Sequence, residues 1–479
     1  NADITASGAI AGVTTLTLAS VGGTATLSAD VDVTTLTVGN TVANVAFTGN
    51  GSSVVNAVAF ANDGTLILGT SGGTQTYNGG LTTTSVGGTV TLNGTIATSN
   101  DAIVFGAVTL GSAVTIDTNA TNGTGDITLG AVTSTNIDLT LDTTSTTGSA
   151  SHTLNGDIRL GSGGALSVTG DVVLGTNVLV IAGGITFNND INADNATNND
   201  RTLTMSSGIG ATISVAGNVG ASQALAGLTI LQSNGTTFSG SVDVSDSNTG
   251  TITLTDTQNN TNIRFEGNVT ADNLTTTAQG YKIFLIGDTT TFTNAVNIKN
   301  TSNIALGNEV GDTLTFNGGL TTTSVGGTVF LSGTIQTSND AVVLGAVTLG
   351  SATTIDTNSS DTTGDITIAA VTGGSNSLTL STGDNVSNTD ISASGAISGV
   401  TTLTLSDVGG TATLSADVDV TTFTVGSTVA NLAFTGNGSS VTSAVAFAND
   451  GTLTLGQDGG TQTYGGGLTT TSVGSTVTL

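Results

Sequence analysis

The chain has 479 residues, of which 37% are hydrophobic and 8% charged, with 69 Gly and no Pro, Cys or Trp. It is too apolar and too weakly charged to be a disordered tail, and it has few of the bulky side chains that fill a wide globular core. The formal net charge of −28 disfavours nucleic acid and anionic lipid as partners. Without cysteine the chain has no disulfides, and it has no apolar run long enough to predict a membrane-spanning helix.

The first segment, Asn1 to Leu92, alternates strand-like phrases with tight corners. In VTTLTL, GTATL and VTTLTV, apolar residues alternate with Thr or small residues, which predicts strands with one buried face. Between them, pairs such as Gly22-Gly23 and Asp63-Gly64 favour corners with positive φ. Two apolar series recur at intervals of 20 to 22 residues: Leu18, Val38, Phe60 and Leu81, and Leu27, Phe47 and Leu68. The sequence therefore predicts coils of about 20–22 residues, each with two or three strands.

Long blocks of the chain also repeat. Asn1 to Leu92 returns with few changes as Asn388 to Leu479, and a block that begins at Asn78 returns at Asn317. We predict one continuous all-β parallel β-solenoid over 1–479, with repeated blocks at 1–133 and 311–479 and nonrepeated central coils at 134–310. Tandem β-sandwich domains are the alternative fold. Because the chain lacks an initiator Met and ends within a repeat, we expect either a mature piece or a part of a longer protein.

Three phrases carry a resemblance to a known group of proteins: VTLGSAVTIDT (Val108 to Thr118), ITLGAV (Ile127 to Val132) and GDITIAAVT (Gly364 to Thr372). They resemble the coils of filamentous-haemagglutinin-type and autotransporter-passenger adhesins. The resemblance implies a right-handed parallel β-helix that is exported to the bacterial cell surface.

The function that we expect from this pattern is structural and not enzymatic. The chain would form a stiff extracellular fibre of a bacterial filament, sheath or biofilm matrix. Neither end shows a polar cap, so we expect self-association, head to tail or lateral. A stalk of a secreted adhesin that attaches cells, with cell-surface glycans as a candidate partner, is the first alternative. A carbohydrate-active enzyme built on a β-helix is the second.

The candidate catalytic residues are few, and we assign none of them to catalysis and none to a cofactor. The single His, His152, lies in a Ser- and Gly-rich phrase and is predicted to be an ordinary exposed side chain. Acid pairs suited to glycoside hydrolysis are Asp30 with Asp32, Asp243 with Asp246, and Asp361 with Asp365. Because the first pair recurs as Asp417 and Asp419, turn chemistry explains these residues better than catalysis.

Calcium is a candidate ion at the Asp- and Asn-rich turns, because their oxygens suit a hard cation. Neither the nonapeptide of calcium-binding β-rolls nor an EF-hand loop is present, so the sequence defines no metal-binding residues.

The central segment 134–310 contains every basic residue of the chain. Those residues are Arg159, Arg201, Arg264, Lys282 and Lys299. A specific partner, if there is one, is therefore expected to bind here. Arg264 and Glu266 are two residues apart on one strand face, which predicts a modest surface ion pair.

Rows of Thr are a further surface feature of the sequence. Thr15 with Thr17 and Thr35 with Thr37 are placed to align on one flat face. Such an array occurs in ice-binding solenoids, but Thr is also the ordinary outward residue of this fold, and we favour that second interpretation.

Overall fold

In the computed structural model, the described part of the chain contains strands and no helix. The described residues are 2–118, 125–144, 150–194, 201–246, 248–358, 360, 362–383 and 388–479. Each strand pairing reported for them is parallel, and partners lie about one coil apart in sequence, as in Leu27 with Phe47 and Phe47 with Leu68. The chain is therefore a β-solenoid of about 20 turns. A tandem β-sandwich is excluded, because its sheets are antiparallel.

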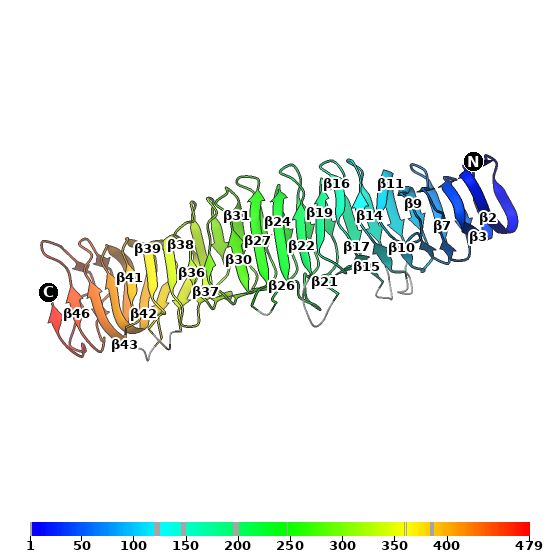
Figure 1. Cartoon of the computed structure of the whole chain (residues 1–479). Helices are drawn as coiled ribbons and strands as arrows, with labels where there is room; N and C mark the ends of the chain where they lie inside the picture. The colour runs from blue at the N-terminus through cyan, green and yellow to red at the C-terminus, as the bar shows by residue number, and fades with distance from the viewer. Residues whose placement is uncertain are drawn as a thin grey trace. The chain divides into compact units, whose positions relative to one another are not determined.

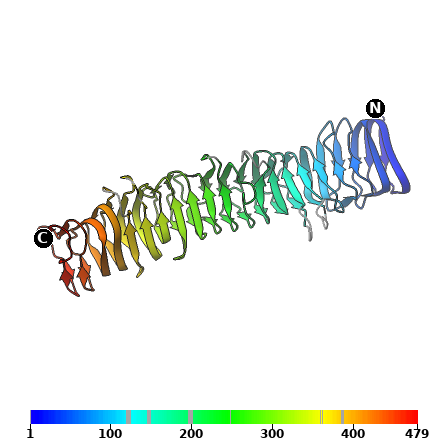
Figure 2. The same cartoon turned by 90° about the horizontal axis from the view of Figure 1, so that it is seen from below.

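The chain divides into two compact units, Asn1–Ser239 and Gly240–Leu479. Within each unit the strands of successive coils lie side by side in stacks (Figure 1), and the view from below shows the same arrangement (Figure 2). The boundary falls inside the central segment 134–310. A single continuous solenoid across that boundary stays a prediction.

Unit 1 contains three parallel stacks of strands. The first stack includes β4 (Ser53–Val54), β7 (Thr74–Tyr77), β14 (Leu139–Asp142), β17 (Leu166–Thr169), β20 (Ile185–Phe187), β23 (Ile213–Val215) and β25 (Thr236–Phe238). The second includes β1 (Ile4–Ala6), β6 (Leu66–Leu68), β13 (Val132–Thr133), β16 (Ile158–Gly161), β19 (Val178–Ala182), β22 (Thr202–Ser206) and β24 (Gly227–Ser233). The third is a separate seven-stranded sheet of β5 (Val58–Ala59), β8 (Leu81–Thr82), β10 (Ile103–Phe105), β12 (Ile127–Leu129), β15 (Ser151–Leu154), β18 (Asp171–Leu174) and β21 (Ile191–Ala193). Longer strands that bend and join the first two stacks are β2 (Ile10–Leu27), β3 (Val31–Phe47), β9 (Val90–Ala97) and β11 (Val108–Asp117).

Unit 2 is built in the same way. Its first stack includes β26 (Val242–Val244), β29 (Val269–Ala271), β32 (Thr289–Phe292), β35 (Thr313–Phe316) and β40 (Leu378–Ser381). Its second includes β28 (Asn262–Phe265), β31 (Lys282–Leu285), β34 (Ile304–Leu306), β44 (Ser440–Val441) and β47 (Thr463–Tyr464). Its third includes β33 (Val296–Asn297), β36 (Leu320–Thr321), β41 (Ile391–Ala393), β46 (Leu453–Leu455) and β49 (Val477–Thr478). Two further pairs are β27 (Thr251–Thr257) with β30 (Asn273–Thr276), and β45 (Val445–Ala446) with β48 (Leu468–Thr469). Longer strands that connect the stacks are β37 (Val329–Gln336), β38 (Val342–Asp356), β39 (Ile366–Thr372), β42 (Ile397–Leu414) and β43 (Val418–Phe434).

The predicted register is largely confirmed. Leu18 pairs with Val38, and the whole series of Leu27, Phe47 and Leu68 is in register. The placement of Leu81 opposite Phe60 is wrong, because Leu81 pairs with Val58.

The predicted coil length holds for the first coils but not throughout. Partners on β2 and β3 are 20 or 21 residues apart, whereas Leu139 and Leu166 on β14 and β17 are 27 apart. The strands of one stack keep similar lengths, so the extra residues lie in the corners.

The core of each unit is a column of inward Val, Leu and Ile with occasional aromatic rings. Phe47, Phe60 and Tyr77 form one aromatic cluster in unit 1, and Phe434, Phe447 and Tyr464 form its copy in unit 2. The Gln75 side chain satisfies the carbonyl oxygens of Phe47 and Gly49 from inside the coil, at 2.8 and 3.2 Å. Burial of these strand faces supplies the main stabilising free energy of the fold.

Candidate functional site

Several of the Asp residues singled out from the sequence accept hydrogen bonds from the backbone of the following coil. The backbone N–H of Gly51 donates to Asp30 Oδ1 at 2.7 Å, and that of Ser53 donates to Asp32 Oδ1 at 3.2 Å, each one coil further along the chain. In the repeated block, Gly438 N–H donates to Asp417 Oδ1 at 2.6 Å. Asp30 and Asp417 lie at corners as predicted, whereas Asp32 and Asp419 lie on the strands β3 and β43.

Of the other acid pairs, Asp243 lies on β26, and Asp246 and Asp365 lie outside the strands. Asp243 Oδ1 accepts hydrogen bonds from the backbone N–H and the hydroxyl of Ser245 at 3.1 and 2.6 Å. The backbone N–H of Asp246 donates to Asp272 Oδ2 at 2.8 Å, so Asp246 is itself held by a carboxylate of the next coil. The backbone N–H of Asp390 donates to Asp365 Oδ1 at 2.8 Å. Asp361 lies outside the described residues.

His152 is buried, and its predicted exposure is wrong. The residue lies on β15, where strand alternation turns it inward together with Leu154, and it stacks between Ile127 and Val172. Its Nε2 lies 3.0 Å from Thr169 O and 3.2 Å from Thr143 Oγ1. Burial lowers the pKa of His152, so the ring is a neutral core group and is closed to a substrate.

Within the described residues, no group of three or more His, Cys, Asp or Glu side chains is placed to hold a metal ion. Calcium at the Asp- and Asn-rich turns stays a prediction with no defined residues.

The predicted ion pair of the central segment is confirmed. Arg264 Nε lies 3.1 Å from Glu266 Oε1 in a partly exposed position, and its guanidinium carbon is 5.1 Å from the centre of the Phe284 ring. Arg159 pairs with Asp157 at 2.8 Å. Such surface pairs contribute little free energy.

The remaining basic residues form no common site. Arg201 Nε lies 2.7 Å from Asp194 Oδ1. Lys282 is a half-buried residue of β31, and Lys299 is exposed beyond β33. A specific partner for segment 134–310 stays a prediction.

The predicted Thr rows align, and each unit also has a separate, longer column of hydroxyl groups. Thr15 pairs with Thr35, and Thr17 pairs with Thr37. The unit 1 hydroxyl column consists of Thr74, Thr95, Thr115, Thr140, Ser167, Thr186, Ser214 and Thr237 on successive coils of the first stack. The unit 2 hydroxyl column consists of Thr289, Thr313, Thr334, Thr354, Thr379, Thr404 and Thr424. Each column places one Thr or Ser outward per coil.

A shallow groove lies at the corner where β2, β3 and β4 meet in unit 1. It has a volume of about 510 Å³. Its lining consists of Gly12, Val13, Thr14, Asp32, Val33, Thr34, Ser53 and Val55. Gly12 has a φ of 73°, and the register of β2 against β3 shifts just beside it, so this residue forms a bulge at one end of the groove.

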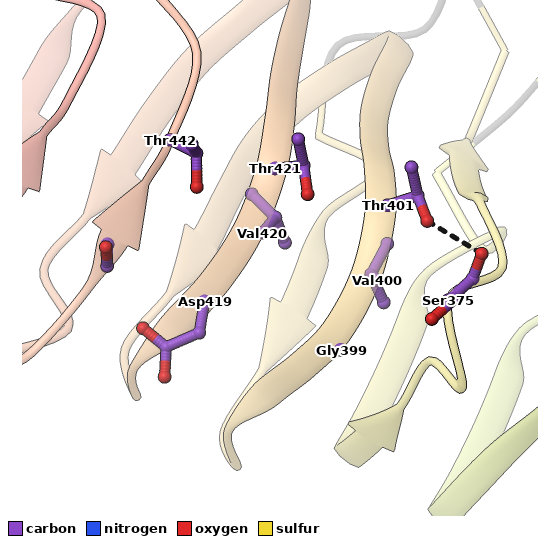
Figure 3. Close-up of a pocket in the computed structure, with 9 residues that line it drawn as sticks. Ser375, Gly399, Val400, Thr401, Asp419, Val420, Thr421 and Thr442 are labelled. Atoms are coloured by element: carbon purple, nitrogen blue, oxygen red, sulfur yellow. Dashed lines mark hydrogen bonds between the residues drawn. The ribbon is translucent and has the colours of Figure 1, made fainter.

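A second groove of about 360 Å³ occupies the corresponding corner of β42, β43 and β44 in unit 2. It is lined by Ser375, Gly399, Val400, Thr401, Asp419, Val420, Thr421, Ser440 and Thr442. Figure 3 shows Thr401, Thr421 and Thr442 on three neighbouring coils, with Val400 and Val420 beside them and Asp419 further along the same corner. The Thr401 hydroxyl donates to Ser375 O at 2.7 Å.

Sequence reasoning did not find these grooves. Their residues come from coils about 20 positions apart, and only the register brings them together. The available signal was the phrase Gly-Val-Thr-Thr at Gly12 and Gly399, in which a bulge glycine precedes two adjacent outward Thr residues.

None of the family models, curated proteins or solved structures that were compared matches this chain. The β-solenoid fold therefore rests on the structure itself. The resemblance to filamentous-haemagglutinin-type and autotransporter-passenger adhesins stays a prediction. Across the described ranges, the structure contains no helix of the length and apolar character needed to cross a membrane.

Proposed function

We propose that the chain is a noncatalytic structural segment of a bacterial extracellular filament, sheath or matrix, and that copies associate through their hydroxyl columns. The observation that carries the proposal is the regular column of outward Thr and Ser, one per coil, in each unit. Neighbouring coils lie about 4.8 Å apart. A second copy presents the same spacing, so two columns meet in register over many coils.

The chemistry of the columns suits association of identical surfaces. A hydroxyl group both donates and accepts a hydrogen bond, so a Thr column is complementary to another Thr column. The backbone groups of these strands already bond the neighbouring coils, as in Thr95 N–H to Gly73 O at 2.8 Å. Side chains must therefore make the contact between copies.

Stacking of the coils supports a mechanical role. Each coil bonds its neighbours through strand ladders, and Asp or Asn side chains brace the corners. Asn44 accepts Thr65 N–H at 2.9 Å, and its copy Asn431 accepts Thr452 N–H at 3.0 Å. Both the extracellular location and the bacterial source are part of the proposal and are supported by the adhesin resemblance.

The net charge of −28 opposes close approach of two copies at low ionic strength. We therefore expect self-association of the purified chain to increase with NaCl concentration, because salt screens this repulsion. Sedimentation velocity and electron microscopy across a salt series measure it. A chain that stays monomeric at every salt and protein concentration contradicts the proposal.

Introducing positive charges into the column locates the contact. Thr115→Lys with Thr140→Lys places two cations on the unit 1 hydroxyl column and should reduce self-association. The matched control is Thr128→Lys with Thr153→Lys, which adds the same charges to the paired strands β12 and β15 of the third stack. Equal effects of the two double variants would refute the assignment of the hydroxyl column.

A further inference from the structure

The grooves of the two units are copies of each other. Eight positions of the first recur 387 residues later in the second: Gly12 as Gly399, Val13 as Val400, Thr14 as Thr401, Asp32 as Asp419, Val33 as Val420, Thr34 as Thr421, Ser53 as Ser440, and Val55 as Thr442. Seven of the eight are identical.

Each groove combines a hydroxyl rim, one carboxylate and an apolar floor. Thr14 and Thr34 are exposed in unit 1, as are Thr401 and Thr421 in unit 2. The floor residues Val33 and Val420 are 4% and 5% exposed. The lining contains no basic and no aromatic side chain.

We infer that both grooves bind a neutral polysaccharide chain that lies along the stacking direction of the coils. Each coil contributes a similar set of groups, so the lining repeats about every 4.8 Å and suits a polymer with its own repeat. Thr and Ser hydroxyls match sugar hydroxyls, which also donate and accept. The Asp carboxylate accepts a stronger, charge-assisted hydrogen bond from a sugar hydroxyl. In the unit 1 groove, Val13, which is 42% exposed, offers an apolar surface to the face of a sugar ring.

Other ligand classes fit the grooves less well. An extended peptide that adds to a sheet needs free backbone groups, but Val55 N–H bonds Val33 O at 3.2 Å, and Thr442 N–H bonds Val420 O at 3.2 Å. An anionic polymer would meet Asp32 or Asp419 in a chain of net charge −28. This inference goes beyond self-association and holds whether or not copies of the chain associate.

The two grooves differ in their lining, and the difference predicts which of them has the higher affinity for the polysaccharide. At one equivalent position unit 1 has Val55, which is 52% exposed, and unit 2 has Thr442. With one more hydroxyl group at this position, the unit 2 groove is expected to bind the polysaccharide more tightly.

The test uses the full chain and a defined set of polymers. Dextran, mannan and a soluble β-glucan are the neutral probes, dextran sulfate is the anionic probe, and polylysine is the cationic probe. Binding is measured by calorimetry at two salt concentrations. We expect at least one neutral polymer to bind with little dependence on salt. Binding of polylysine or dextran sulfate alone, or of none of the polymers, would overturn the inference.

Variants then locate the binding. Asp32→Asn with Asp419→Asn changes both grooves, and the loss of a charge-assisted bond should weaken binding about tenfold. Asp63→Asn with Asp450→Asn is the matched control, because these exposed carboxylates form another duplicated pair outside the groove linings. Equal affinity of the two double variants contradicts the groove assignment.

A reciprocal exchange tests the ranking of the grooves. Thr442→Val should weaken the tighter of two binding steps, and Val55→Thr should strengthen the weaker one, each about fivefold, as expected for one hydrogen bond. Unchanged thermal unfolding of each variant shows that the coils remain folded. Affinities unchanged by both exchanges would exclude these positions from the ligand contact.

Discussion

The carboxylate of Asp30 holds the backbone N–H of Gly51 on the following coil, at 2.7 Å. The repeated block reproduces the contact between Asp417 and Gly438 at 2.6 Å. A corner amide that would otherwise be left to solvent is thereby tied to the preceding coil. Acidic residues of this type are therefore structural parts of the solenoid as well as the source of its charge.

Removing this brace should loosen one corner without unfolding the unit. Asp30→Ala is expected to lower the local free energy of opening by about 1 kcal/mol, the net worth of one hydrogen bond. Hydrogen exchange at the Gly51 amide measures the effect. Asp417→Ala should accelerate exchange at Gly438 by a similar factor, and a large difference between the copies would argue against a purely local brace.

His152 should make the folding stability of the chain depend on pH near neutrality. Burial lowers the pKa of the folded-state His152 below its usual value of about 6.5. The unfolded chain therefore takes up a proton first, so stability is complete above about pH 6.5 and is lost as the pH falls toward the lowered folded pKa.

His152→Leu should remove this dependence, because Leu fits between Ile127 and Val172 and does not titrate. Denaturant midpoints at several pH values between 7.5 and 5.5 provide the measurement, roughly the range over which histidine titrates. As His152 is the single histidine of the chain, parallel pH profiles for the wild type and the variant would contradict this account.

Gly94 should not tolerate a side chain. It has a φ of 65°, and a Cβ placed there would lie 2.3 Å from Thr70 O. Gly94→Ala is expected to destabilise unit 1 by about 1–3 kcal/mol, as for other strained backbone positions. Gly333→Ala tests the equivalent position of unit 2, where a Cβ would lie 2.3 Å from Asp312 O. Gly8→Ala is the control, because no atom lies within 4 Å of its Cβ position. Equal thermal midpoints for Gly8→Ala and Gly94→Ala would show that the corner relaxes.

Arg264 should contribute little to stability. A double-mutant cycle of Arg264→Ala and Glu266→Ala is expected to give a coupling free energy of about 0.2–1 kcal/mol, because both side chains are partly exposed. Arg264→Lys should lose the stacking over Phe284 and part of the coupling. A coupling well above this range would indicate that the pair has a role beyond surface packing.

The sequence predicts the class of fold well because alternation and corner residues are local signals. Thr-Leu-Thr-Leu fixes which side chains point inward, and Gly and Asn residues mark the corners, as at Asn100 with a φ of 73°. The register in which strands of neighbouring coils pair is harder to predict. The misplacement of Leu81 relative to Val58 and Phe60 arose because period alone does not show how many residues a corner such as Asn78-Gly79-Gly80 uses.

Site residues were harder to predict than the fold, for two physical reasons. His152 lies among Ser and Gly residues that suggest a turn, but its spacing of two from Leu154 places it on the inward face. The grooves depend on contacts between coils, since Thr14, Thr34 and Val55 meet only after the register is set. Neither feature has a signature within one short window of sequence.

The corner brace also has an evolutionary consequence. The acceptor on one coil and the N–H on the next are the same in both copies of the block, so an unequal crossover between copies joins coils whose hydrogen-bonding partners already match. Selection can then lengthen or shorten the protein without redesigning a core. We expect natural alleles to differ by whole coils, with their junctions inside the repeated blocks and not inside the central segment.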